Sequence, residues 1–408
     1  MLIESEVQTQ RKVTIKEITN AVRAVINTRT EEITDEEVLS IIEDFVLHDS
    51  RTKWYPYAKK IKLTETVFNI TRRELDILQP YADDNEVSEI MVNGAKKIFV
   101  ERNGKIEKLP ILFEDREDLE EIIRRLAAKV HREINELTPI VDARLEDGSR
   151  INAVYRNVAL NGPILTIRKF PKKKITMEEL ILKDSISEEA SAFLKKLVRS
   201  GYNIFISGGT SSGKTTFLNV LSDCIPREER VIVIEDSAEL QITKIDNVVR
   251  METKNANVQG KGEVTVRDLI KASLRMRPDR IIVGEVRGGE VVDMIQAMNT
   301  GHDGSLSTGH GNSPEGMLRR LEAMFLSAAD FPMEAIRSQI LEAIDIIVHL
   351  GRLPNKSRKI LQIVEIAGYK NEKYIINPLF QYQISRGLIA TGNPLNNQIK
   401  LEMRGGEL

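Results

Sequence analysis

The chain has 408 residues, and at about 150 residues per domain this length predicts two or three domains. Hydrophobic residues make up 41% and charged residues 29%, so each domain can bury a core and the composition is not that of a disordered chain. The 59 basic and 61 acidic side chains nearly cancel, which argues against a dedicated nucleic-acid coat protein but leaves a local basic patch open. The single cysteine, Cys224, excludes an internal disulfide and a four-cysteine zinc site.

The beginning of the chain shows no secretory signal, because its first ten residues lack a basic stretch followed by an apolar one. No apolar run approaches the ~20 residues that a membrane-spanning helix needs. We therefore expect a soluble, cytosolic, multidomain protein.

Residues 1–77 predict a mostly helical region. Asp35 is the expected N-cap of one helix, and its apolar face follows a helical period. The residues of that face are Val38, Leu39, Ile41, Ile42, Phe45 and Val46. Residues 53–60 contain the only tryptophan, Trp54, and are read either as a packed elbow, which we favour, or as a partner surface.

Residues 78–170 predict a small α+β domain. Strands are expected at 88–92, 97–101, 105–109, 141–145 and 149–154. Asn-Gly or Asp-Gly dipeptides separate three pairs of these strands, which is a strong hairpin signal. Asp115 is the expected N-cap of an amphipathic helix. Residues 171–178, which open with a proline and three lysines, are expected to be an interdomain linker.

Residues 179–375 alternate strands with helices, a pattern typical of a parallel sheet covered on both faces. Wholly apolar strands are expected at 204–207, 231–234 and 280–283. A helix is expected from about Glu188, and another after the Ser313 cap, with Pro314 at its first position. Residues 376–408 are expected to be a C-terminal tail.

Residues 208–215 fit the phosphate-binding pattern G-x-x-x-x-G-K-[ST] at every fixed position, between a buried strand and a helix. Glycines let backbone N–H groups surround phosphates, Lys214 reaches the β- and γ-phosphates, and Thr215 ligates Mg²⁺. The expected nucleotide-binding residues are Gly208, Gly209, Thr210, Ser211, Ser212, Gly213, Lys214, Thr215 and Thr216.

Two acidic strand ends follow the phosphate loop. Glu235 and Asp236 end one apolar strand, and Glu285 ends another. Carboxylates at this edge of a parallel sheet lie where ligands bind, and they can hold Mg²⁺ or orient the attacking water. His302 and His310 flank a further strand, and a hydrogen-bonding role toward the γ-phosphate or a neighbouring subunit suits them better than a zinc site.

This series of motifs resembles the secretion ATPases of the type II/type IV secretion superfamily. Residues 208–215, 234–240, 283–288 and 300–310 match, in order, the Walker A motif, Asp box, Walker B motif and His box of that family. Residues 89–94, 141–153 and 162–170 look like the CpaF-type branch, which serves tight-adherence pili.

The resemblance implies an α/β fold in which a PAS-like N-terminal domain precedes a RecA-like P-loop ATPase domain with a parallel sheet. It also implies a homo-hexameric ring that hydrolyses ATP with Mg²⁺ and holds the nucleotide between its two domains. The residues that it implies for catalysis are Lys214, Glu235, Glu285, Arg150, Arg168, His302 and His310. Thr215 and Glu285 are the implied Mg²⁺ contacts, directly or through water.

The resemblance further implies a cytoplasmic motor, peripheral on the inner face of the membrane, that works with an inner-membrane pilus or secretion platform protein. We expect no specific nucleic acid and no membrane insertion. Secretion or conjugative transfer of another cargo remains an alternative, as does a nucleotide-dependent scaffold without useful turnover. The intact Lys214, Glu235 and Glu285 argue against the scaffold. Residues 1–69 match no motif.

Overall fold

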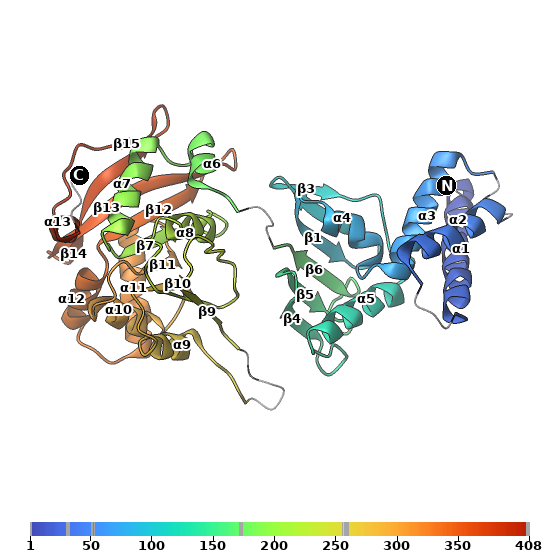
Figure 1. Ribbon diagram of the computed structural model, residues 1–408, viewed down its shortest axis with the longest axis horizontal. Coiled ribbons are helices and arrows are strands. Elements are labelled where there is room, and N and C mark those ends of the chain that lie inside the picture. Colours follow the sequence, from blue (N-terminus) through green and yellow to red (C-terminus); the bar gives the residue numbers. More distant parts are fainter. Residues whose placement is uncertain are drawn as a thin grey trace. The chain divides into compact units, whose positions relative to one another are not determined.

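The computed structural model describes residues 2–29, 33–49, 52, 54–170, 174–254, 256 and 261–404. The chain divides into two units, residues 1–172 and 173–408, which are described separately here (Figure 1). The first three residues of the expected linker, 171–173, lie outside the described residues. None of the described helices has the length and apolarity needed to cross a lipid bilayer.

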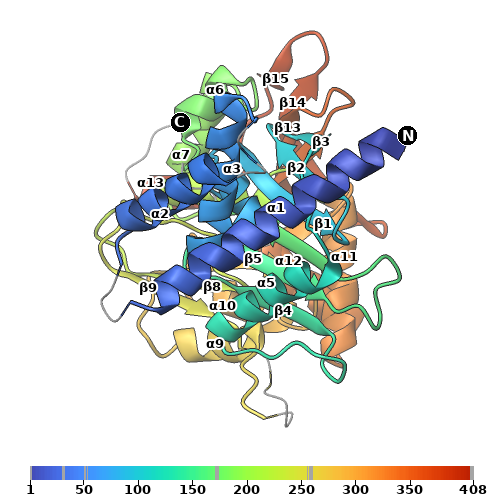
Figure 2. The ribbon, with the colours of Figure 1, turned by 90° about the vertical axis from the view of Figure 1, so that its right-hand side faces the viewer.

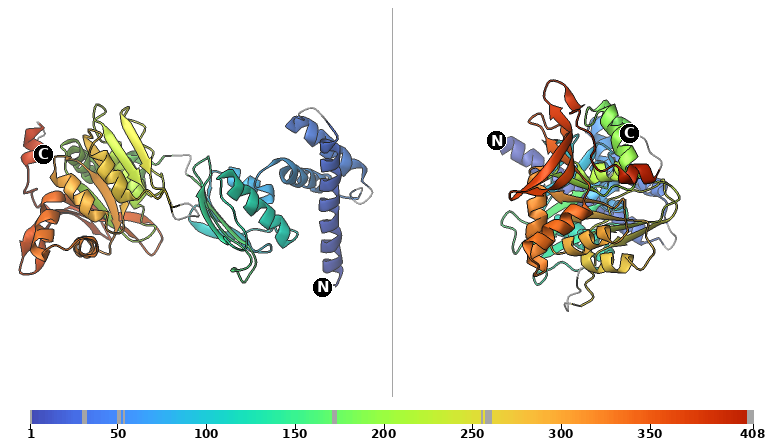
Figure 3. Two further views of the ribbon diagram at one scale, coloured as in Figure 1. Left: turned by 90° about the horizontal axis from the view of Figure 1, so that it is seen from below. Right: turned by 90° about the vertical axis from the view of Figure 1, so that its left-hand side faces the viewer.

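The first unit begins with three helices, α1 (Leu2–Asn27), α2 (Asp35–His48) and α3 (Tyr57–Arg72). The three helices pack against one another (Figures 2 and 3). Ile18, Ile42 and Val67, one from each helix, share a small core. The N-cap of α2 is Thr34 and not Asp35, because the Thr34 hydroxyl accepts from Glu37 N–H at 3.3 Å while the Glu37 carboxylate accepts from Thr34 N–H at 2.8 Å.

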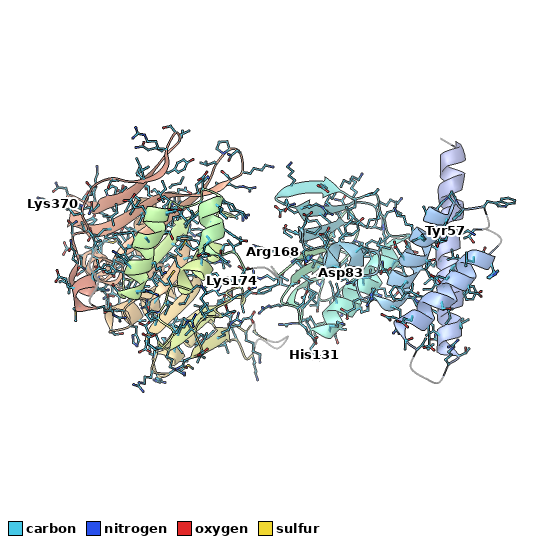
Figure 4. All side chains as sticks on the ribbon, turned by 45° about the horizontal axis from the view of Figure 1, so that its top comes forward. Tyr57, Asp83, His131, Arg168, Lys174 and Lys370 are labelled. Carbon is cyan, nitrogen blue, oxygen red and sulfur yellow. The ribbon has the colours of Figure 1, made fainter. Side chains whose placement is uncertain are left out.

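The expected packed elbow forms only in part, because Tyr55 packs against the helical core while two neighbouring aromatic side chains do not. Trp54 is 85% exposed and Tyr57 is 76% exposed. Figure 4 labels Tyr57 at the start of α3. The favoured interpretation of this segment is therefore wrong for these two aromatic side chains.

The rest of the first unit is a six-stranded antiparallel sheet with helix α5 (Arg116–Lys129). The elements before α5 are η1 (Asp76–Leu78), α4 (Gln79–Asp83), β1 (Val87–Asn93), β2 (Ile98–Arg102) and β3 (Lys105–Lys108). Those after it are β4 (Ile140–Arg144), β5 (Arg150–Val154) and β6 (Ile164–Arg168). The strand order is β3-β2-β1-β6-β5-β4. The five predicted strands and the Asp115 cap are confirmed, because each strand matches within one residue.

The second unit contains a nine-stranded sheet in the order β15-β14-β13-β12-β7-β11-β10-β8-β9. Its parallel part comprises β7 (Ile204–Gly208), β8 (Val231–Glu235), β9 (Val248–Glu252), β10 (Arg280–Val286), β11 (Leu306–His310) and β12 (Ile346–Arg352). The predicted α/β fold with N-terminal helices is confirmed, but the sheet is mixed, since β13, β14 and β15 pair antiparallel.

Helices cover both faces of the parallel part and bury two apolar cores (Figure 1). On one face lie α6 (Met177–Leu182), α7 (Glu188–Arg199) and α8 (Lys214–Ser222). On the other lie α9 (Val266–Ser273), α10 (Val291–Asn299), α11 (Pro314–Ala328) and α12 (Met333–Ala343). Ser313 caps α11 and Pro314 occupies its first turn, as predicted.

The region expected to be a C-terminal tail, 376–408, contains regular structure instead. After β13 (Arg358–Lys370), strand β14 (Lys373–Gln383) runs into this region, and β15 (Gly387–Ala390) and α13 (Ile399–Met403) lie within it. Leu388, Leu395 and Leu401 from this region enter the core with α7 and α8. Strand β15, helix α13 and the segment between them thus bury apolar side chains that are too widely spaced along the sequence to show a period.

Candidate functional site

The phosphate loop lies at the carboxyl end of β7 and leads into α8. Gly213 caps the helix in the left-handed region at φ +97°, which favours glycine. A Cβ on Gly208 would lie 2.6 Å from the Leu350 carbonyl oxygen, so only glycine lets β7 and β12 approach this closely. The hydroxyl of Ser212 is buried and, among the described residues, has no hydrogen-bond partner. The loop therefore offers the free N–H groups of a helix start and a free hydroxyl to an anion.

The backbone of the phosphate loop holds the side chain of Lys214 over the loop. Its Nζ donates to the Gly209 carbonyl at 3.1 Å and lies 3.3 Å from His310 Nδ1. Burial lowers the pKa of Lys214, while the nearby Glu285 carboxylate opposes that shift. A buried cation therefore already occupies the position from which it can meet a phosphate.

Glu285 is the centre of a charged network at the end of β10. Arg287 donates to Glu285 Oε2 at 2.9 Å, and its guanidinium also lies 3.5 Å from Asp236. His310 Nε2 is 2.8 Å from Glu285 Oε1, although the angle is not that of a hydrogen bond. Burial alone would raise the pKa of Glu285, but Arg287, His310 and Lys214 together lower it.

The two ring nitrogens of His310 face different residues. Nδ1 faces Lys214, and Nε2 faces Glu285. Burial and the Lys214 charge lower the pKa of His310, while Glu285 opposes the shift. The ring is therefore mainly neutral at pH 7, and it connects the phosphate loop to the acidic end of β10.

Glu235 ends β8 and is buried, with 4% of its surface exposed. Its Oε1 accepts from Glu239 N–H at 2.8 Å and from Leu240 N–H at 2.9 Å. Burial raises the pKa of Glu235, and these two hydrogen bonds oppose the rise. One carboxylate oxygen therefore holds the loop after β8. A Cβ on Gly284 would lie 3.0 Å from Glu235 Cγ, so this glycine admits Glu235 beside Glu285.

His302 is not brought to the phosphate loop. It precedes β11, whereas His310 ends the same five-residue strand. His302 and His310 therefore lie at opposite ends of β11. His302 Nδ1 is 3.1 Å from the Ala297 carbonyl oxygen, at the end of α10.

Arg287 and His349 carry interactions at the site that the sequence reasoning did not assign. Arg287 follows Glu285 by two residues, and the strand period of two could have placed both on one face. His349 on β12 lies 3.1 Å from the hydroxyl of Ser207 on β7, and both side chains are buried. Only the pairing of β12 with β7 shows this contact, because 142 residues separate the two side chains.

Arg150 and Arg168 lie in the first unit, directly opposite one another on β5 and β6. Arg144 on β4 is opposite Arg150 on the other side, so three arginines form a row across three strands. Glu89 on β1 follows Arg168 in the same row. Figure 4 labels Arg168 where β6 ends. The row therefore holds three guanidinium groups and one carboxylate, a local excess of positive charge that favours an anion.

The residues of the phosphate loop suit a nucleotide with Mg²⁺. Among the described residues, no group of three acidic, histidine or cysteine side chains could hold a metal ion alone. Thr215 is the second residue of α8, after Lys214, and Glu285 is the last but one residue of β10, beside His310. A hydroxyl and a carboxylate in these positions fit an ion whose remaining ligands come from phosphate and water.

Residues 72–378 match the family model described as type II/IV secretion system protein. The chain is 32% identical over 330 residues to a putative conjugal transfer protein of Mycobacterium tuberculosis, covering 79% of this chain and 92% of that protein. It is 31% identical to the type IV secretion system protein VirB11 of Brucella suis, and the match covers 68% of this chain and 84% of that protein. It is 43% identical to an uncharacterized protein of Methanocaldococcus jannaschii, of which it covers only 34%.

Solved structures agree with this fold. The ATPase DotB of Legionella pneumophila is similar with a TM-score of 0.51 and 20% identity, covering 71% of this chain and 80% of that one. The pilus retraction motor PilT with bound ADP is similar with a TM-score of 0.51 and 20% identity, covering 81% and 87%. At these identities the similarity shows the fold alone.

Proposed function

Because the chain belongs to the type II/IV secretion system protein family, we propose that it is an ATP-hydrolysing motor of a pilus-assembly or secretion machine. The observation that carries this proposal is the chain of contacts from the phosphate loop through Lys214 and His310 to Glu285. It combines a phosphate-binding cation with a carboxylate in one network, as hydrolysis of a phosphoanhydride requires.

Lys214 binds the β- and γ-phosphates of ATP in this mechanism, and the N–H groups that open α8 complete the phosphate cradle. Thr215 and Glu285 would hold Mg²⁺, and that ion would supply positive charge to offset the charge that develops on the phosphates. Since Arg287 and His310 already lie against Glu285, binding would require that carboxylate to exchange at least one of these partners.

Glu235 orients the attacking water in the proposed mechanism. Its Oε1 is anchored by two backbone N–H groups, which leaves Oε2 for the water. Burial raises the pKa of Glu235, which makes its carboxylate a better proton acceptor than an exposed one. In this proposal, His310 responds to the γ-phosphate through its contact with Lys214. His302, at the opposite end of β11, contacts a neighbouring subunit.

Arg150 and Arg168 supply positive charge to the γ-phosphate when the N-terminal domain closes over ATP. A guanidinium stays charged and binds two phosphate oxygens at once. ADP lacks the γ-phosphate, so closure relaxes after phosphate release and each turnover produces one domain movement. In a homo-hexameric ring, such movements would act on a membrane platform protein from the cytoplasmic side.

We propose that the machine is a tight-adherence type of pilus, because residues 89–94, 141–153 and 162–170 resemble the CpaF-type ATPases. The second candidate is conjugative transfer, since relatives at 32% and 34% identity are named conjugal transfer proteins. Deleting the gene distinguishes the two. Loss of surface pili with normal DNA transfer supports the pilus motor, and the reverse result supports the conjugative one.

The motor itself is tested by ATP turnover together with assembly. We expect phosphate release from ATP and Mg²⁺, and a ring that forms or tightens with a non-hydrolysable ATP analogue in sedimentation. A strictly monomeric chain with nucleotide and Mg²⁺ at working concentrations would remove the ring. ATP binding without any turnover by the assembled protein would favour the scaffold.

A further inference from the structure

Lys174, the last of the three linker lysines, does not extend into solvent. It is the first residue after 171–173 that the structure describes, and its side chain is only 15% exposed. Its Nζ donates to Asp223 Oδ1 at 2.5 Å and to the Gln241 carbonyl oxygen. Figure 4 labels Lys174 at the beginning of the second unit. The linker is therefore attached to the second unit through a mostly buried cation.

Both partners of Lys174 belong to segments that the proposed ATPase site uses. Asp223 is the C-cap of α8, the helix that follows the phosphate loop. Gln241 follows Leu240, whose N–H group donates to Glu235 Oε1 at 2.9 Å. Lys174 therefore contacts both the far end of the phosphate-loop helix and the loop that is bonded to Glu235.

The loop after β8 depends on its neighbours for its conformation. Residues 238–243 form neither helix nor strand. The Gln241 N–H group donates to Asn219 Oδ1 on α8 at 2.9 Å, and Arg250 on β9 donates to the Leu240 carbonyl oxygen at 2.5 Å. Lys174 adds a contact from the linker. Loss of this contact would give the loop, and the N–H groups that it presents to Glu235, more conformational freedom.

The charge of Lys174 is balanced where it lies. Its partner Asp223 carries the opposite charge and is mostly buried too. A buried cation is tolerated when it is paired, so the two side chains hold one another in place. A second cation, Lys244, lies 3.7 Å from the other oxygen of Asp223, but its side chain is 56% exposed. Asp223 would therefore still face a positive charge if Lys174 were replaced.

We propose that Lys174 is a positioning residue for ATP hydrolysis, which holds the loop after β8 so that Glu235 keeps the orientation that its role requires. This inference rests on the proposed function, because the role of Glu235 toward the attacking water is proposed there. Lys174 acts through Gln241 and Leu240, and not by contact with the reacting atoms. Since the linker from the first unit meets the second unit at this residue, a movement of the linker would reach Glu235 by the same route.

Lys174→Met removes the cation and keeps an unbranched side chain of similar length. We expect kcat for ATP hydrolysis to fall ~10-fold, because a small misplacement of a reacting group lowers the rate strongly. KM for ATP and the affinity for ADP should stay within about 2-fold of wild type, since the phosphate loop is untouched. Lys174→Arg keeps the charge and the donors, and it should retain most of the wild-type kcat.

Lys244→Met is the matched control, because it removes the exposed lysine that also faces Asp223. It should leave kcat unchanged, and an equal kcat in Lys174→Met and Lys244→Met would overturn the proposal. Lys174→Gln, a milder change that keeps an N–H donor, is measured beside Lys174→Met. Loss of ADP binding in both of these variants would also overturn the proposal, because Lys174 would then support the whole unit and not one loop.

Combining Lys174→Met with Glu235→Gln tests whether Lys174 acts through Glu235. If it does, Lys174→Met should lower kcat much less in the Glu235→Gln background than in the wild type, because the carboxylate that it positions is already gone. The same ~10-fold fall in both backgrounds would show that Lys174 acts elsewhere, and it would contradict the assignment.

Hydrogen exchange separates this inference from the proposed function, because it needs no ATP turnover. In Lys174→Met, peptides that cover residues 236–242 should exchange faster than in the wild type, whereas those from α10 should not change. Wild-type exchange at 236–242 would refute the inference even if the chain hydrolyses ATP. Absence of turnover by the wild-type chain would instead refute the proposed function, and exchange at 236–242 would still decide whether Lys174 holds the loop.

Discussion

The charged residues proposed to act on ATP are arranged differently in the two units. At the phosphate loop, opposite charges alternate, since Glu285 lies among Lys214, His310 and Arg287. On the sheet of the first unit, Arg144, Arg150 and Arg168 stand side by side across three strands. The first arrangement mixes both signs of charge around one carboxylate, whereas the second places three positive charges beside a single negative one, Glu89.

This difference separates what the two regions contribute. A balanced network holds its side chains in position before any nucleotide binds, which is what a preorganised site requires. The arginine row, with Glu89 at its end, holds a local excess of positive charge, which is suited to meet a phosphate that comes and goes. The second unit would then hydrolyse ATP, and the first would respond to the presence or absence of the γ-phosphate.

Replacing Lys214 tests the balanced network and should have the largest effect. Lys214→Ala removes the main cation of the β- and γ-phosphates and should abolish turnover, a loss of ~10³-fold or more. Phosphate release measures the effect, and Lys195→Ala, an exposed lysine on α7, is the control. Turnover within 10-fold of wild type (roughly 1.4 kcal/mol) would mean that another group binds these phosphates.

The arginine row is tested by Arg150→Ala and Arg168→Ala. Each should lower hydrolysis by ~10³-fold, because a transition-state charge loses its partner, while ADP affinity changes little. Calorimetry with ADP and steady-state rates provide the two measurements. Normal rates of ATP hydrolysis in both variants would show that these arginines are ordinary surface charges and that the proposed difference between the two units is wrong.

Glu235→Gln distinguishes a catalytic from a structural carboxylate. The glutamine Oε1 can accept the same bonds from the N–H groups of Glu239 and Leu240, so the loop after β8 should survive. We expect ATP to bind normally and hydrolysis to fall ~10²-fold or more, since the proton acceptor is lost. A wild-type rate would show that Glu235 only holds the loop. Nucleotide binding and phosphate release are measured on the same sample.

Asp76→Asn should give the smallest effect, a change in the stability of the first unit that depends on pH. Folding raises the pKa of Asp76 from 3.8 to about 6, so the stability that this carboxyl contributes is complete below pH 3.8 and is lost as pH rises through 6. The variant should therefore gain about 1–3 kcal/mol at pH 8 and nothing at pH 4. Thermal unfolding at both pH values measures this, and an equal gain at both would contradict the assigned pKa.

Much of the local structure could be predicted from the sequence. The hairpins at Asn93-Gly94, Asn103-Gly104 and Asp147-Gly148 formed as expected, because these dipeptides adopt the backbone angles of tight turns. The phosphate loop, its strand and its helix were equally predictable, since their glycines and their lysine are adjacent in sequence.

Contacts between distant residues were decided only by the tertiary structure. The separation of His302 from the phosphate loop follows from the direction of β11, and the place of Arg144 beside Arg150 follows from the register of β4 on β5. The addition of β14 and β15 to the sheet, and a cavity lined by α1 and α5, depend on which faces pack together. Local patterns reflect backbone preference and periodicity, whereas these features depend on side chains that meet only after the chain has folded.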